Sequence, residues 1–208
     1  MALLTSPLSS GKEALQKAMF PTTITEPLPT NDGYTWTIAS RIAQAMREAE
    51  SLYGPRDKNY FFAGFEFCKD APQLWYPGNC MRVVMQLNIN AMNDAGLAAY
   101  QLSHEVIHLL SPTGGRNANV MEEGLALYFS EYFSGKNGFP NIRCTIPSYI
   151  DARNHVLELL KKDKDAIRTL RTIEPCISKI TADQICERYP DISPILAKLL
   201  TSKFERGA

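Results

Sequence analysis

The sequence carries no net charge, no long apolar run and no internal repeat. Lysine plus arginine equals aspartate plus glutamate at 22 each, so there is no global electrostatic reason to expect a nucleic acid or a membrane surface as partner. The longest apolar stretches fall well short of the roughly 18 residues that span a bilayer. We therefore expect a chain that binds neither nucleic acid nor membrane.

The possible cysteine chemistry is also limited. The five cysteines are an odd number and contain no Cys-x-x-Cys pair. This pattern argues against a zinc ribbon and excludes a disulfide framework that uses every cysteine of one chain. The first ten residues lack the basic region and long apolar core of a usual secretory signal. These features predict a reduced, cytoplasmic protein; export by another route, with up to two disulfide bridges, is the alternative.

The sequence does contain enough apolar residues for a globular core. Of its 208 residues, 45% are hydrophobic, an ordinary share for a folded protein. Residues 1–35 are rich in Pro, Ser and Thr and predict an irregular N-terminal arm. Residues 36–138 predict a compact α+β core, and residues 139–208 predict an all-helical C-terminal subdomain.

Hydrophobic periodicity predicts the elements within this plan. Ile38, Ile42, Ala45 and Ala49 recur at helical spacing, so we expect an amphipathic helix over residues 37–53. The remaining elements are expected as strands 60–67 and 81–87 and helices 94–110, 120–134, 148–162, 163–173, 181–189 and 191–204.

One helical turn carries side chains that can bind a metal ion. Residues 104–108 read His-Glu-Val-Ile-His, inside a helix that Asp94 can cap. Four residues span slightly more than one turn, so both imidazoles leave the same face about 6 Å apart along the axis. That spacing lets His104 and His108 bind one zinc ion. Glu105 lies one position round the helix, where its carboxylate is expected to act as the general base for the attacking water.

A third ligand is expected from the next helix, where two adjacent glutamates compete for the role. Glu122 follows Asn119 by three residues, the spacing of a capping box, and so has a local structural role available. Glu123 has no such partner. Gly124 costs about 1 kcal/mol in a helix relative to alanine, and its missing side chain leaves room for the zinc-bearing helix to approach closely. We therefore favour Glu123 as the ligand, with Glu122 as the alternative.

The two motifs in this order resemble the gluzincin metallopeptidases, the group of thermolysin and the zinc aminopeptidases. The resemblance lies in His104-Glu-x-x-His108 followed by Glu123-Gly-Leu-Ala-x-Tyr, and it covers about residues 81–134. It implies a zincin-like core, in which a small mixed sheet lies beside an active-site helix and a glutamate-ligand helix. The helical C-terminal subdomain would then complete the cleft.

The resemblance also implies the roles of individual residues. His104, His108 and Glu123 would hold one zinc ion per chain, and Glu105 would be the base. The strand at residues 81–87 would be the sheet edge along which a peptide substrate lies.

The chain departs from the family pattern at three points. Many relatives have an aromatic residue three positions before the glutamate ligand, whereas this chain has Val120. Glu122 replaces the asparagine that commonly precedes the ligand. The glycine- and methionine-containing exopeptidase motif of the aminopeptidases is not found on the preceding strand, so nothing supports aminopeptidase specificity.

Gluzincins generally supply a tyrosine or histidine from well downstream to stabilise the oxyanion of the tetrahedral intermediate. His155 is the remaining histidine of this chain and Tyr149 begins the same expected helix, so both are catalytic candidates. The helical neighbours Asp151 and Glu158 place His155 on a polar face. A surface histidine beside carboxylates is therefore the alternative for that residue.

These features favour a zinc-dependent peptidase that acts on a peptide or protein. One alternative is a zinc-binding domain with a degenerate peptidase fold and a regulatory or interaction role. A metal-free helical interaction protein is the other. The sequence assigns neither the cleavage specificity nor the oligomeric state.

Overall fold

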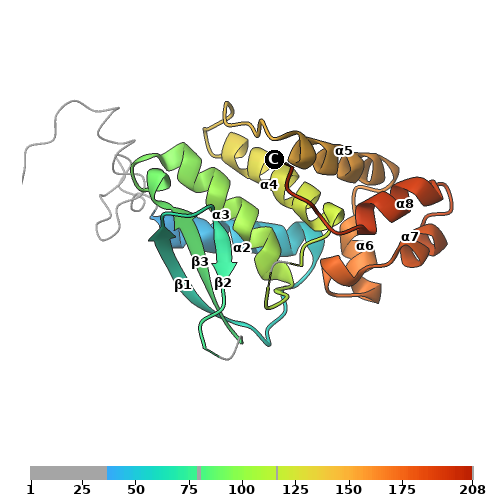
Figure 1. The fold of residues 1–208 in the computed structure, drawn as a ribbon, viewed down its shortest axis with the longest axis horizontal. Coiled ribbons are helices and arrows are strands. Elements are labelled where there is room, and N and C mark those ends of the chain that lie inside the picture. The colour runs from blue at the N-terminus through green and yellow to red at the C-terminus, as the bar shows by residue number, and fades with distance from the viewer. Residues whose placement is uncertain (1–36, 79–80, 116, 208) are drawn as a thin grey trace, which may run out of the picture.

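The computed structural model describes residues 37–78, 81–115 and 117–207. Over these ranges the protein is α+β, with seven α-helices and one three-stranded mixed sheet. The sheet lies toward one end of the molecule and the last three helices lie toward the other (Figure 1). The predicted N-terminal arm at residues 1–35 falls outside the described residues.

The first half of the chain forms the sheet and the helices next to it. Its elements follow the predicted order closely, with one short strand that periodicity did not predict. They are α2 (Ile38–Tyr53), β1 (Phe61–Cys68), β2 (Gln73–Trp75), β3 (Arg82–Asn88), a 3₁₀ turn (Ile89–Asn93), α3 (Ala95–Leu110) and α4 (Val120–Lys136). A capping box between Thr37 and Ser40 begins α2, and Gly54, with φ 94°, ends it.

The strand order β1-β3-β2 corrects one expectation. The strand predicted at residues 81–87 is β3, and it lies in the middle of the sheet rather than at its edge. It pairs in parallel with β1 and antiparallel with β2. The edge strand on that side is β2, which is only three residues long and follows Pro72, so it shows no alternation that a pattern could detect.

Alternation along β3 anchors the sheet to the helices. Val83, Met85 and Leu87 are fully buried in the main core, whereas Gln86 on the other face bonds to side chains of the two neighbouring strands. One face of the sheet is therefore apolar and packed, whereas the other carries polar side chains beside the exposed ring of Trp75.

Helix α4 is the central helix of the bundle and packs against both α3 and α5 (Pro147–Lys162). Leu125, Phe129 and Phe133 are fully buried on it. A helix that is apolar on most of its faces is stable only when it is covered by other elements.

Gly124 of α4 has a different neighbour from the one expected. The backbone that approaches Gly124 belongs to α5, not to the histidine-bearing helix α3. A Cβ at Gly124 would lie 2.3 Å from the backbone oxygen of Ala152 and 2.9 Å from Cγ2 of Val156. Glycine is therefore required at this position by the close packing of α4 on α5.

The C-terminal part is helical as predicted, but the last three helices are shorter than expected. The elements of this part are α5, α6 (Ala166–Ile173), a 3₁₀ turn (Ile177–Lys179), α7 (Ala182–Arg188) and α8 (Pro194–Thr201). The helix predicted over 191–204 begins only after the cap Ser193 and ends at Thr201. It ends there because the following residues leave the helix to pair with the start of α4, where Asn119 and Lys203 form an antiparallel bridge.

The main core contains residues from both the predicted α+β core and the predicted C-terminal subdomain. Among the described helices, none combines the length and the apolar character that crossing a membrane requires. The described cysteines Cys68, Cys144, Cys176 and Cys186 are free thiols.

We predict that Gly124→Ala destabilises the protein by about 1–3 kcal/mol, because the added methyl group forces the backbones of α4 and α5 apart. Gly135→Ala on the same helix is the matched control. A Cβ there would have Pro140 as its nearest neighbour, at 3.9 Å, so this change should stabilise the protein by up to about 1 kcal/mol. Urea unfolding of both variants measures the two effects. Equal free energies of unfolding for the two variants would contradict the packing described for Gly124.

Candidate metal centre

Helix α3 presents His104 and His108 side by side on one face. Asp94 begins the helix by accepting a hydrogen bond from the backbone N–H of Leu97 at 2.9 Å. The two ring centroids are 5.2 Å apart, and each side chain is about six-sevenths buried, with relative exposures of 16% and 15%. The spacing predicted from the sequence is therefore realised in the fold.

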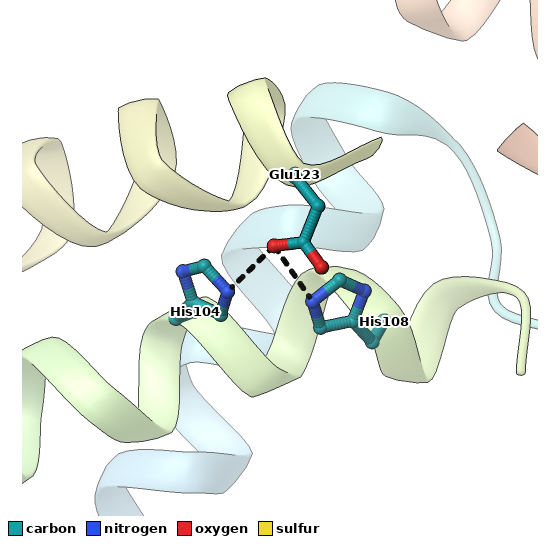
Figure 2. Close-up of side chains that lie close together, drawn as sticks. All are labelled: His104, His108 and Glu123. Atoms are coloured by element: carbon teal, nitrogen blue, oxygen red, sulfur yellow. Dashed lines mark ion pairs between the residues drawn. The ribbon is translucent and has the colours of Figure 1, made fainter. Parts of the chain in front are cut away.

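Glu123 reaches across from α4 and meets both imidazoles (Figure 2). Its Oε2 atom lies 3.2 Å from Nε2 of His104 and 3.8 Å from Nε2 of His108. One ligand atom from each of the three residues lies within 4.8 Å of the others. Ligand atoms arranged tetrahedrally around one zinc ion at about 2.0–2.1 Å are roughly 3.3 Å apart. The group can therefore hold one metal ion with little side-chain movement.

The hydrogen bonding of Glu123 supports the same interpretation. Its Oε2 atom is buried and has no hydrogen-bond partner, although it lies at ion-pair distance from Nε2 of both histidines. Buried polar atoms are nearly always satisfied in folded proteins. A cation bound between the three residues would provide the missing partner of Oε2 of Glu123.

The charges at the cluster are strongly coupled. Burial alone would raise the pKa of Glu123, but His108 and His104 lower it to about 2. Burial would likewise lower the pKa of His108, but Glu123 and Glu122 raise it to about 10. The anionic surroundings that favour a proton on His108 also favour a metal cation in its place, since metal and proton compete for the same nitrogen.

Glu122 has a different role from the one predicted. Asn119 does cap α4 by accepting a hydrogen bond from the N–H of Glu122 at 2.9 Å. The reciprocal bond of a capping box is absent, because the N–H of Asn119 donates to Ser178 instead. The Glu122 carboxylate accepts hydrogen bonds from Nδ1 of His108 and from the hydroxyl of Ser178.

This contact orients the histidine. A carboxylate only accepts, so Nδ1 of His108 carries a hydrogen and Nε2 is the atom left to bind a metal. The preference for Glu123 over Glu122 as the ligand candidate agrees with the geometry. The capping-box argument behind that preference was wrong.

Glu105 is buried in the wall of the same site. It is 3% exposed, and burial raises the pKa of its carboxyl, an effect that His108 and His104 partly oppose. It lines a cavity of about 490 Å³ together with the two histidines, Glu122 and Glu123. The remaining wall comes from residues 70–74 and 76, the loop after α3, and three residues of the C-terminal part, namely Tyr149, Phe204 and Arg206.

The two candidate oxyanion donors are placed differently. Tyr149 is 7% exposed and lines the cavity, with its ring centroid 6.0 Å from that of His104. Its hydroxyl accepts two hydrogen bonds from Arg206. His155 lies on the same helix and is partly buried, but it does not belong to the cavity wall. The fold therefore brings Tyr149 to the site and leaves His155 outside it.

Sequence reasoning missed three contributors to the site. They are the edge strand β2, Ser178 behind Glu122, and Arg206 on the C-terminal segment. No motif marks any of them. Each reaches the site through contacts with residues far away in the sequence.

We predict that the protein binds about one divalent metal ion per chain and that Glu123→Gln reduces the affinity most, because it removes a charged ligand. Glu122→Gln should weaken binding by roughly 10- to 100-fold, the usual effect of losing a carboxylate behind a histidine ligand. Competition with a chromophoric chelator measures both constants. Glu131→Gln, on the same helix and paired with Arg153 away from the site, is the control and should leave the affinity unchanged. A larger loss for Glu122→Gln than for Glu123→Gln would reverse the two assignments.

Comparison with known proteins gives no relative from which a role could be transferred. No family model, no curated protein and no solved structure matches this chain. The function must therefore be inferred from the geometry of the site.

Proposed function

We propose that the protein is a zinc-dependent peptidase of the gluzincin type. The observation that carries this proposal is the convergence of Nε2 of His104, Nε2 of His108 and Oε2 of Glu123 beside the buried carboxyl of Glu105, in the wall of an open cavity. In this proposal α3, α4 and the small mixed sheet form a zincin-like core, and α5 and the C-terminal segment complete the cleft.

The donor set supports zinc and a catalytic role. Two imidazole nitrogens and one carboxylate oxygen are common zinc ligands, and three protein ligands leave a position free, as catalytic sites require. A bound zinc ion supplies Lewis-acid chemistry, which lowers the pKa of a water molecule and polarises a substrate carbonyl.

Glu105 is suited to move the proton. It follows His104 directly, so its carboxylate lies beside the ligand cluster without belonging to it. Burial raises its pKa, and a carboxylate with a raised pKa is a stronger base. In the proposed reaction Glu105 accepts a proton from the attacking water and then delivers it to the leaving amine.

The edge strand β2 supports a peptide as substrate. Gln73 and Leu74 lie both on this strand and in the cavity wall. The strand pairs with β3 on one side, and no described strand covers its other side. An extended peptide can add to such an edge through main-chain hydrogen bonds, which suit substrates of varied sequence.

Tyr149 is the better candidate for stabilising the oxyanion. Its hydroxyl accepts hydrogen bonds from Nε of Arg206 at 3.1 Å and from Nη2 at 2.7 Å. Two accepted bonds leave the hydroxyl hydrogen available to donate to substrate. A preoriented donor in a partly buried site is the arrangement that stabilises a developing oxyanion.

We predict that Glu105→Gln retains zinc but loses roughly 10²- to 10⁴-fold in peptide hydrolysis, because the amide cannot accept the proton. Mass spectrometry of a library of unstructured peptides measures turnover, and elemental analysis measures bound zinc. Treatment with a chelator should abolish the wild-type activity, and added zinc should restore it. Zinc binding without turnover of any peptide by the wild type would instead indicate a zinc-binding domain with a regulatory or interaction role.

We predict that Tyr149→Phe lowers kcat by roughly 10²- to 10³-fold with little change in KM, because it removes a donor to the transition state. The phenyl ring can keep the packing against Phe204, whose ring centroid is 4.7 Å away. His155→Gln, on the same helix but outside the cavity wall, is the matched control and should change kcat by less than about twofold. The opposite result, with His155→Gln inactive and Tyr149→Phe active, would make His155 the donor.

A further inference from the structure

The C-terminal segment, residues 202–207, folds back over the start of two helices and reaches the cavity. The carbonyl of Ser202 accepts a hydrogen bond from the N–H of Val120 at 2.9 Å, and the N–H of Phe204 donates to the carbonyl of Ala118 at 3.1 Å. Farther on, the N–H of Gly207 donates to the hydroxyl of Ser148 at 3.2 Å. These bonds on both sides of Arg206 hold its backbone at the cavity wall.

The guanidinium of Arg206 is positioned without being neutralised. It donates from Nε and Nη2 to the Tyr149 hydroxyl, a neutral acceptor, and lies 5.6 Å from the centre of the Tyr149 ring. Arginine has five N–H donors, so three are left. Among the described residues, no carboxylate lies within the 4.0 Å of an ion pair with Arg206.

Arg206 is also unusual among the residues around it. It is the one arginine or lysine among the described residues that line the cavity, which includes the acidic side chains of Asp70, Glu105, Glu122 and Glu123. A bound zinc ion would offset only two of these four negative charges, so a substrate with a negative charge would still be repelled unless another cation at the wall compensated for the rest. A guanidinium with unused donors is the side chain that binds a carboxylate through two parallel hydrogen bonds.

We propose that Arg206 binds a carboxylate of the substrate, so that the protein acts preferentially on peptides with a negative charge close to the scissile bond. This inference rests on the proposed peptidase function. The carboxylate can be the C-terminal group of a short peptide or an aspartate or glutamate side chain, since the guanidinium recognises both in the same way.

Peptides that differ only in this charge test the proposal. One pair has the same sequence with a C-terminal carboxylate or a C-terminal amide, and a second pair has glutamate or glutamine next to the cleaved bond. The wild type should prefer the charged member of at least one pair by roughly 10- to 100-fold in kcat/KM, the effect of a charged hydrogen-bonded pair. The pair that responds identifies the source of the carboxylate.

Variants then assign the preference to Arg206. Arg206→Met should bring the ratio between charged and uncharged peptides close to one, and Arg206→Lys should keep part of it because the charge remains while the fork of donors is lost. Lys203→Met is the matched control, because Lys203 is exposed on the same segment and does not line the cavity. This variant should keep the wild-type ratio.

A binding measurement separates this proposal from the peptidase function. Calorimetry with Glu105→Gln, which should hydrolyse the peptides far more slowly than the wild type, gives the affinity for the charged and uncharged member of each pair. The charged member should bind roughly 10- to 100-fold more tightly, and adding Arg206→Met should remove the difference.

Each outcome bears on one of the two proposals. No turnover of any peptide, with a charge preference in binding that depends on Arg206, would overturn the peptidase function and support the carboxylate site. Turnover by the wild type without a charge preference would overturn the carboxylate site. An equal loss on charged and uncharged peptides in Arg206→Met would also overturn it, because Arg206 would then act only through Tyr149.

Discussion

Helix α4 is packed between α3 and α5, and the candidate site depends on that packing. One side of its first turn carries Glu123 to the two histidines of α3. Immediately next to it, Gly124 lets the backbone of α5 approach within a distance that a methyl group would block. The position of the glutamate relative to the histidines, and of Tyr149 relative to both, is therefore fixed by how closely the three helices pack.

Two adjacent glutamates serve this arrangement in different ways. Successive helical residues point about 100° apart, so Glu123 can face the ligand nitrogens while Glu122 contacts the far side of the His108 ring. The hydroxyl of Ser178 donates a hydrogen bond to the Glu122 carboxylate and accepts one from the N–H of Asn119. The short 3₁₀ turn at 177–179 thus supports both the start of α4 and the orientation of His108, which explains why a site on two helices needs the C-terminal part of the chain.

The local parts of this structure could be predicted from sequence and the long-range parts could not. The helical spacing of His104 and His108 and the cap at Asp94 depend on neighbours within one or two turns, so the pattern contains the information. The edge strand β2 is defined by its pairing with β3. It is only three residues long, which is too short for an alternation of apolar and polar residues to be recognised in the sequence. The role of Glu122 was misjudged because Asn119 offered a local partner, whereas the partners that the carboxylate contacts lie on α3 and at Ser178.

The same distinction explains the C-terminal segment. Apolar periodicity continues past Thr201, so a helix to residue 204 is the natural prediction. The chain instead leaves the helix after Thr201 and pairs with the start of α4. That exchange turns the last residues from a surface helix into part of the cavity wall and places Arg206 against Tyr149. Arg206 lines the same cavity as four carboxylates, and it is held there by the backbone hydrogen bonds of its segment rather than by an ion pair. It therefore keeps its charge available to a ligand, which a cation already paired with Glu105 or Glu123 would not.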